Sequence, residues 1–332
     1  MAMERVPYLV GGGFEHSAEV MRAMLAASTS GAEGIVNAGD FKVRPLAVPG
    51  TSVRVAPGNA LIRNSYGGGQ AQTYACRAGS ETVVAIEATG SAGSRTDLIV
   101  ARIDDPTYQG GSFDPLTFEA ARFEVIQGVP ESTKTVAGLG LTYPAVPLAR
   151  VKLPASTGTV TAGMITDLRK LAQPRKERHL FIEPLVTDDG NLRLYSTETH
   201  GQVWPNTTSW RVDVPSWAQR MRVVANWGGV LIRGVSEPAN AYGTIWARLG
   251  SGSTVVVTQR TGWNISDAPT DNVRESWMTG DDHAVPAALR GVSDVTLELR
   301  GRVTVADDLI SKPLLDAHSV ASLDVEFYET AV

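Results

Sequence analysis

Three adjacent residues in the second half of the chain have side chains that could bind a metal ion. Asp281, Asp282 and His283 offer two carboxylates and an imidazole, which are ordinary metal ligands. Three neighbours cannot enclose an ion by themselves, and no spaced set such as His-Glu-x-x-His or an EF-hand loop supplies further ligands. We therefore interpret the triplet as a solvated acidic loop and predict no metal site, with a bound calcium ion as the alternative.

Two tryptophans lie close to this triplet in the sequence. Trp263 and Trp277 belong to the stretch 261–286, which has weak periodicity and much Asp, Thr and Gly, so we expect an extended loop there. An exposed indole on such a loop could stack on a sugar ring or a partner surface, whereas the alternative is that the rings only anchor the loop. The predicted surface-binding residues are Trp263, Trp277, Asp281, Asp282 and His283.

The other candidates for chemistry do not form an enzyme motif. Gly11-Gly12-Gly13 precedes a predicted helix, but the phosphate-binding pattern needs spaced glycines and a lysine, and Glu15 would repel phosphate. Asp188-Asp189-Gly190 is typical of a turn between strands, with a glycosidase carboxylate as the alternative. None of the five histidines lies in a catalytic motif, and the sequence has no Gly-x-Ser-x-Gly elbow. We predict no catalytic residue and no cofactor.

Composition argues against several classes of protein. Cys76 is the only cysteine, so neither an internal disulfide nor a multi-cysteine zinc site can form. No apolar run approaches the ~20 residues that span a bilayer, and residues 1–14 lack the length and flanks of a secretory signal. We therefore expect synthesis in a cytoplasm and no membrane insertion. A net charge of -5 and a basic cluster confined to 169–178 do not make a nucleic-acid footprint.

Alternating side chains predict the strands that would position these residues. Val295 and Leu297 alternate with polar neighbours, which is the pattern of an antiparallel sheet with one wet face. The run 98–101 is apolar throughout, which favours a strand buried on both faces. One helix is predicted near the start, where Ser17 can cap residues 18–25.

These patterns predict a mainly β protein built from two β-sandwich or barrel-like domains with a short N-terminal helix. All seven tryptophans lie in the second half, which suggests two domains of different origin. The polar stretch after Gln173 contains a helix-breaking proline, so we place a linker at 174–180. The N-terminal domain then covers 1–173, and the C-terminal domain, 181–332, is expected to be a jelly-roll-like sandwich.

Four stretches of the first half carry a resemblance to a known family. They read Gly-Asp-Phe-Lys-Val at 39–43 with Pro-Gly-Thr-Ser-Val-Arg-Val-Ala-Pro-Gly-Asn-Ala at 49–60, Ser-Arg-Thr-Asp-Leu-Ile-Val-Ala-Arg-Ile-Asp-Asp-Pro at 94–106, Pro-Leu-Ala-Arg-Val at 147–151, and Ile-Thr-Asp-Leu-Arg at 165–169. In this order they resemble the minor tail proteins of actinobacterial siphophages, including those of the tail tip or baseplate. The second half is similar to β modules appended to such proteins.

The resemblance implies a structural protein of the virion. It implies homo-oligomeric assembly, often as a homotrimer, contacts with other phage tail proteins, and no catalytic residues. The N-terminal domain would attach to the virion, and the C-terminal domain would project outward as a receptor-binding head, with a host cell-surface glycan as its candidate ligand. The alternatives are a pure scaffold that binds no receptor and a cell-wall or capsule depolymerase.

Overall fold

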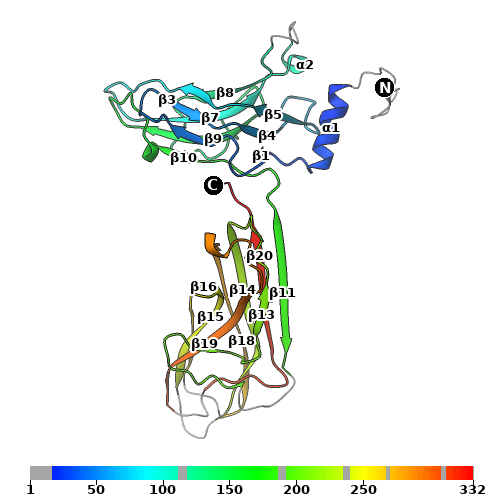
Figure 1. Cartoon of the computed structure of the whole chain (residues 1–332), viewed down its shortest axis with the longest axis vertical. Coiled ribbons are helices and arrows are strands. Elements are labelled where there is room, and N and C mark those ends of the chain that lie inside the picture. The colour runs from blue at the N-terminus through cyan, green and yellow to red at the C-terminus, as the bar shows by residue number, and fades with distance from the viewer. Residues whose placement is uncertain are drawn as a thin grey trace. The chain divides into compact units, whose positions relative to one another are not determined.

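The computed structural model describes residues 17–110, 118–185, 192–234, 240–266, 270–307 and 312–331 (Figure 1). The glycine run 11–13, Glu15 and the predicted turn 188–190 lie outside the described residues. The chain divides into two compact units, which comprise Met1–Pro174 with Thr330–Val332, and Arg175–Glu329. Among the described residues, no helix is both long and apolar enough to cross a bilayer.

The described chain is mainly β, which confirms the predicted fold class. The predicted N-terminal helix is present as α1 (Ala18–Ser28). The Ser17 side chain accepts a hydrogen bond from the Val20 backbone N–H at 3.1 Å, which satisfies one of the amides that the helix start leaves without an internal partner. After α1, strands account for most of the regular structure in both units.

The first unit contains three antiparallel sheets. Their strand orders are β1-β4-β5, β2-β3-β6 and β10-β9-β7-β8. The elements are β1 (Gly34–Ile35), β2 (Val43–Pro45), β3 (Ser52–Val55), β4 (Gly58–Arg63), β5 (Thr73–Ala78), β6 (Thr82–Ala85), β7 (Arg95–Ile103), α2 (Pro106–Gln109), β8 (Ala121–Ile126), β9 (Ala145–Leu153), η1 (Ala162–Met164) and β10 (Ile165–Asp167). Ile99 and Ala101 of β7 lie in one apolar cluster, and Leu98 and Val100 lie in another, which confirms the predicted strand buried on both faces.

The stretches that carry the family resemblance lie together in this unit. Those at 94–106, 147–151 and 165–169 contribute β7, β9 and β10, which are neighbours in one sheet. The Arg169 side chain from the last stretch is fully buried, pairs with Asp167, and donates to the backbone carbonyl of Asp40 in the first stretch at 2.6 Å. Because a buried cation needs partners to offset its lost hydration, these polar residues hold the unit together.

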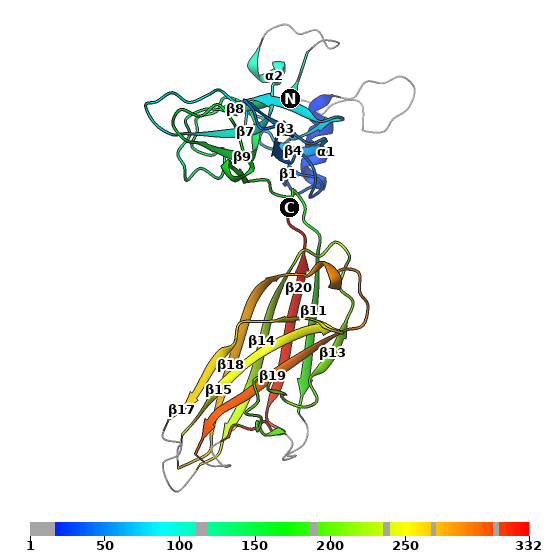
Figure 2. The same ribbon diagram turned by 60° about the vertical axis from the view of Figure 1, so that its left-hand side comes forward.

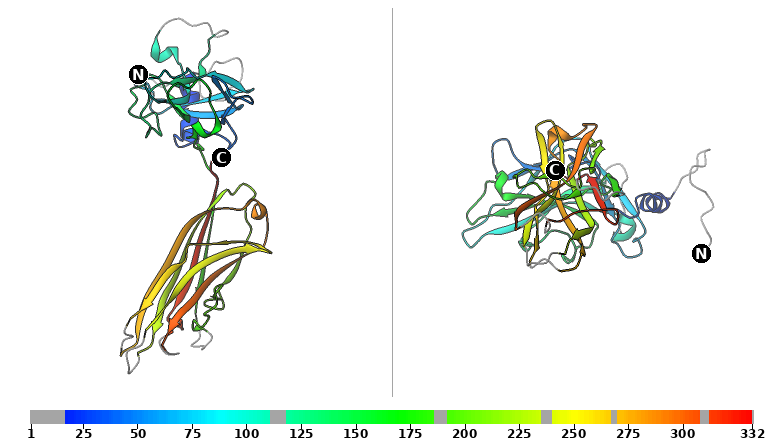
Figure 3. Two further views of the ribbon diagram at one scale, coloured as in Figure 1. Left: turned by 90° about the vertical axis from the view of Figure 1, so that its left-hand side faces the viewer. Right: turned by 90° about the horizontal axis from the view of Figure 1, so that it is seen from below.

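The second unit is a sandwich of two antiparallel sheets (Figure 2). One sheet has the order β11-β20-β14-β18; in the other, β19 pairs with β12, β13 and β15, and β15 also pairs with β16 and β17. The elements are β11 (Lys176–Pro184), β12 (Gln202–Val203), β13 (Ser209–Val212), β14 (Arg220–Ile232), β15 (Ala241–Ser251), β16 (Thr254–Val257), β17 (Thr261–Ile265), β18 (Val273–Ala284), η3 (Ala287–Leu289), β19 (Val295–Ala306) and β20 (Val320–Tyr328). The chain crosses repeatedly from one sheet to the other, which is jelly-roll-like connectivity. Figure 3 shows the long strands of this unit running alongside one another.

Two predictions for this unit are wrong. The linker expected at 174–180 ends at Lys176, where β11 begins and pairs with β20 over its whole length. The stretch 261–286, expected as an extended loop, contains β17 and β18. The inward positions of β18, opposite buried residues of β14, carry Thr279, Asp281 and His283, so its sequence lacks the apolar alternation of a core strand.

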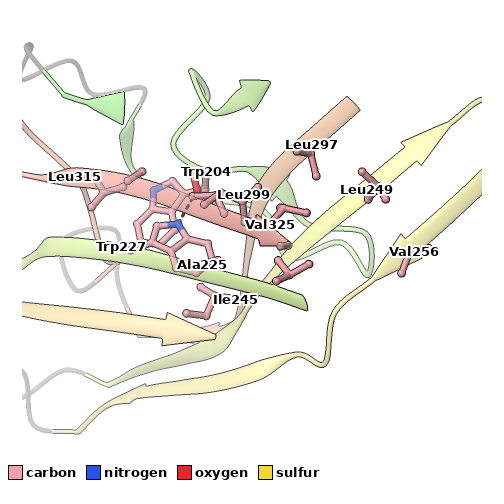
Figure 4. Packing of buried hydrophobic residues seen from close by; sticks show 14 of the residues in the cluster. Trp204, Ala225, Trp227, Ile245, Leu249, Val256, Leu297, Leu299, Leu315 and Val325 are labelled. Atoms are coloured by element: carbon pink, nitrogen blue, oxygen red, sulfur yellow. Dashed lines mark hydrogen bonds between the residues drawn. The ribbon is translucent and has the colours of Figure 1, made fainter. Parts of the chain in front are cut away.

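Tryptophan side chains fill much of the space between the two sheets (Figure 4). Trp204 and Trp227 are fully buried, with ring centroids 6.3 Å apart. The Trp227 Nε1 donates to the backbone carbonyl of Trp204 at 2.8 Å, and the Trp204 Nε1 donates to the carbonyl of Leu192 at 2.7 Å. Both polar ring atoms are therefore satisfied, as burial of an indole requires.

Candidate interaction surface

The two tryptophans of the predicted binding surface lie in strands. Trp263 of β17 is only 6% exposed and belongs to the sandwich core, so it is not the exposed loop indole that the sequence predicts. Trp277 of β18 is partly exposed and stacks on Trp263, with ring centroids 5.2 Å apart and an interplanar angle of 12°. The Trp277 Nε1 donates to Glu275 at 2.8 Å. Trp263 therefore packs in the core, and of the two tryptophans only Trp277 exposes part of its side chain to solvent.

The acidic triplet lies on β18, where strand geometry sends alternate side chains to opposite faces of the sheet. Asp281 accepts from the backbone N–H of Gln259 at 2.6 Å and lies 2.8 Å from His283 Nε2. The Gln259 N–H is the main reason that the pKa of Asp281 lies below its usual value. Asp282 points the other way. The triplet therefore does not converge, and the described residues contain no group of three His, Cys, Asp or Glu side chains that could hold a metal ion.

Asp282 belongs to a row of charges that crosses the outer face of the sheet β11-β20-β14-β18. Cross-strand register places Arg178 opposite Glu326, Glu326 opposite Arg222, and Arg222 opposite Asp282. The row therefore reads positive, negative, positive, negative from one sheet edge to the other. We call these four residues the charge row.

Ion pairs tie the charge row to its own sheet. Arg178 makes two hydrogen bonds to Asp324, at 2.8 and 2.6 Å, and Asp282 pairs with Arg220 at 2.6 Å. Burial acts to raise the pKa of Asp282, but the Tyr328 hydroxyl and the Arg220 guanidinium outweigh it and lower this pKa. The Arg178 side chain remains 65% exposed, so it keeps a face open to solvent. Pairs exposed to this degree stabilise a fold little, and their arrangement bears more on recognition.

Apolar side chains gather beside the charge row on the same outer face. Leu180 and Ile182 of β11 are 58% and 57% exposed, Met278 of β18 is 66% exposed, and Val224 of β14 is 36% exposed. The register places Leu180 and Val224 on either side of Asp324, in the cross-strand line next to the charge row. We call these four residues the apolar patch. Asp324 and Ser322 of β20 separate Leu180 and Ile182 from Val224 and Met278, so the patch mixes apolar and polar side chains, as protein interfaces commonly do.

A shallow hollow lies where the charge row meets the apolar patch. Its volume is about 320 Å³, and it is lined by Arg178, Arg222, Val224, Asp324 and Glu326. The hollow mixes carboxylates and guanidinium groups with one apolar side chain, so it suits another protein surface of mixed charge. Sequence reasoning misses this face because β11 carries apolar residues on both sides, with Phe181 packed inward and Leu180 and Ile182 outward.

The first unit has a separate cavity of about 900 Å³. Its lining includes three exposed cationic residues, Arg63, Lys134 and Lys170, and an apolar wall that contains Leu141 and Leu168. Three cationic side chains beside apolar ones would suit an acidic ligand that also has an apolar part.

Comparison with known proteins does not identify a family for this chain. No protein-family model and no curated protein sequence matches the chain. Solved structures with partial likeness come from infectious bursal disease virus. That of its T13 viral particle is 12% identical, with a TM-score of 0.27, and the match covers 90% of this chain and 66% of that one. That of the Gx strain is 10% identical, with a TM-score of 0.27, and the match covers 89% and 75%. This chain thus spans just under two thirds of the first structure, and likeness this low carries no inference about function.

Proposed function

We propose that this protein is a structural component of a virion, a minor tail protein of the tail tip or baseplate, which acts by assembly and turns over no substrate. The observation that carries the proposal is the outer face of the sheet β11-β20-β14-β18. Its apolar patch and its charge row form a surface suited to another protein. The resemblance of the first half to siphophage tail proteins supports the same role.

The proposed partners are copies of this chain and other tail proteins. A subunit with an exposed apolar patch gains from association, because the partner removes that area from water. Association also stabilises each fold by mass action, which suits a particle that must survive outside a cell. Binding of a host cell-surface glycan through Trp277 and the residues 281–283 stays a prediction. It does not depend on Trp263, whose ring lies in the core.

Mass spectrometry of purified particles tests the proposal. Particles from the phage that encodes this chain should yield its peptides at a constant ratio to other tail proteins, after washing in high salt. Absence of those peptides from infectious particles would contradict the structural role. Release of reducing sugar or peptide fragments from host envelopes by the purified chain would instead identify a depolymerase.

A further inference from the structure

We propose that the cavity of the first unit binds a small anionic amphiphile, which is an organic acid with one acidic head group and an apolar body. The cavity volume of about 900 Å³ lies within the ~300–1,000 Å³ that is usual for sites of small ligands. The acidic head lies among Arg63, Lys134 and Lys170, and the apolar body lies against Leu141 and Leu168. The inference goes beyond the proposed function, and neither depends on the other.

The apolar side of the cavity is the open end of a small hydrophobic cluster. The segment between β8 and β9 packs on one face of the sheet β10-β9-β7-β8, where it contacts Leu98 and Val100 of β7. The members of this cluster that line the cavity are Val136, Leu141, Tyr143, Ala145 and Leu168. All of them except Ala145 are only partly buried. An apolar ligand body therefore completes the cluster and removes these side chains from water.

Positive charge without a partner is concentrated at the same cavity. Among the described residues, Arg63, Lys134 and Lys170 have no carboxylate within ion-pair distance, whereas many cations of this unit do have one. The paired cations include Arg22, Lys42, Arg54, Arg95, Arg102, Arg122, Lys152 and Arg169. Glu33 is the one carboxylate in the lining, so three cations against one acid leave a net charge of +2. An acidic head group would find partners there that the protein itself does not supply.

The wall that carries Lys170 is fixed by backbone contacts. The Ile35 N–H donates to the Lys170 carbonyl at 2.8 Å, and the Ala172 N–H donates to the Ile35 carbonyl at 2.9 Å. Gly34 permits this close approach, because a Cβ at that position would lie 2.2 Å from the Lys170 oxygen. The chain after β10 is therefore held against β1 before any ligand arrives.

The other two cations come from separate elements that are also anchored. Arg63 is the last residue of β4 and lies opposite Thr73 of β5 in the sheet register. Lys134 follows Thr133, whose carbonyl accepts from Arg150 of β9 at 3.3 Å. A site assembled from three anchored segments loses little conformational entropy when the ligand binds.

The lining favours an amphiphile over a simpler ligand. A bare anion would gain little from cations that are exposed to water, because exposed ion pairs contribute weakly. A neutral apolar molecule would leave the unpaired cations without a counter-charge. An acidic peptide segment offers both features but is longer than a cavity of this volume encloses. A small acid with an apolar body satisfies the cations and the open cluster together.

Titration calorimetry of the full chain with sodium dodecanoate, below its micelle-forming concentration, tests the site. We expect saturation at one ligand per chain, a negative heat-capacity change from apolar burial, and weaker binding at high salt. Acetate has the head group without the chain, and dodecyl maltoside has the chain without the charge, so neither should saturate the site. Each methylene removed from the chain should weaken binding about two- to fourfold.

Charge removal identifies the cavity as the site. Arg63→Gln, Lys134→Gln and Lys170→Gln should each raise the dissociation constant about threefold, and the triple variant should raise it roughly thirtyfold. All three side chains are exposed, so circular dichroism should show an unchanged fold. Arg44→Gln is the matched control. Arg44 is likewise exposed, has no ion pair among the described residues and lies outside the cavity lining, so its loss should not change the affinity.

A second control removes part of the apolar patch of the other unit. Leu180 and Ile182 are the more exposed of the apolar residues on β11, and a fatty acid could bind them without entering the cavity. The variant Leu180→Ser with Ile182→Ser should bind dodecanoate as tightly as the wild-type chain.

The outcomes decide the inference. Saturable binding that needs both the acid and the chain, and that the triple variant loses, supports it. Binding that the triple variant keeps, or that the Leu180→Ser with Ile182→Ser variant loses, places the ligand elsewhere and overturns it. Absence of dodecanoate binding also overturns it. In that event, binding of a synthetic peptide of alternating Glu and Leu, lost in the triple variant, would assign the cavity to a protein partner instead.

Discussion

The two buried tryptophans of the second unit give a matched test of its core. Trp227 is 0% exposed and its Nε1 donates to the Trp204 carbonyl, whereas Trp263 is 6% exposed and its Nε1 is buried without a hydrogen-bond partner among the described residues. Trp227→Phe and Trp263→Phe remove the same atoms from comparable burial. The two variants should therefore differ mainly in what happens to the indole N–H.

The difference between the two variants is predictable in size. Each substitution leaves a cavity that costs about 1–2 kcal/mol. Trp227→Phe also leaves the Trp204 carbonyl without its donor, which adds about 1–3 kcal/mol. Trp263→Phe removes an unpaired buried donor, which offsets most of its cavity cost. We expect Trp227→Phe to lower the free energy of unfolding by at least about 2 kcal/mol more than Trp263→Phe.

Urea unfolding followed by tryptophan fluorescence measures this difference. All seven tryptophans lie between residues 204 and 277, so the signal reports the second unit alone. With a slope near 2 kcal/mol per molar urea, the midpoint of Trp227→Phe should lie about 1 M below that of Trp263→Phe. Equal midpoints, or a lower midpoint for Trp263→Phe, would refute the hydrogen-bond reasoning.

Three further predictions concern single side chains. Gly243→Ala puts a Cβ 1.9 Å from a carbonyl oxygen of β19 and should lower the free energy of unfolding by more than about 2 kcal/mol. The Cβ of Gly262→Ala meets nothing closer than 3.9 Å, so thermal unfolding of this variant should show a loss of under about 1 kcal/mol. Arg274 lowers the pKa of Asp316, so that carboxylate stabilises the fold above its unfolded pKa near ~4 and less as the pH falls through its folded value. Asp316→Asn should therefore be less stable than wild type at pH 7, and in urea titrations the difference should shrink as the pH falls below the unfolded pKa and through the folded one. Burial raises the pKa of Cys76 to about 11, so iodoacetamide at pH 8 should label it far more slowly than it labels the urea-unfolded chain, and equal rates would contradict that environment.

Local signals in the sequence correctly predict a helix or strand where neighbouring residues alone determine it. Ser17 ahead of an apolar helical face predicts α1, because the cap and the face agree. The run 98–101 predicts β7, because only burial on both faces explains four successive apolar residues. The alternation at Val295 and Leu297 predicts β19, because burial of one face of a strand requires an apolar residue at every second position.

The sequence could not predict features that depend on pairing between distant segments. β18 carries polar residues on its inward side, so only its register with β14 identifies it as a strand. The sequence alone predicts that Trp263 lies in a loop. In the structure β17 pairs with β15, and the Trp263 ring lies in the core. The charge row joins residues from four strands, and no linear pattern links Arg178 to Asp282. Long-range register therefore fixes both the core and the candidate surface.

A reconstruction of the intact particle tests the central claim most directly. The account predicts density for this chain at the tail tip or baseplate. A particle whose tail contains no density for this chain would contradict the claim that it is a structural protein of the virion.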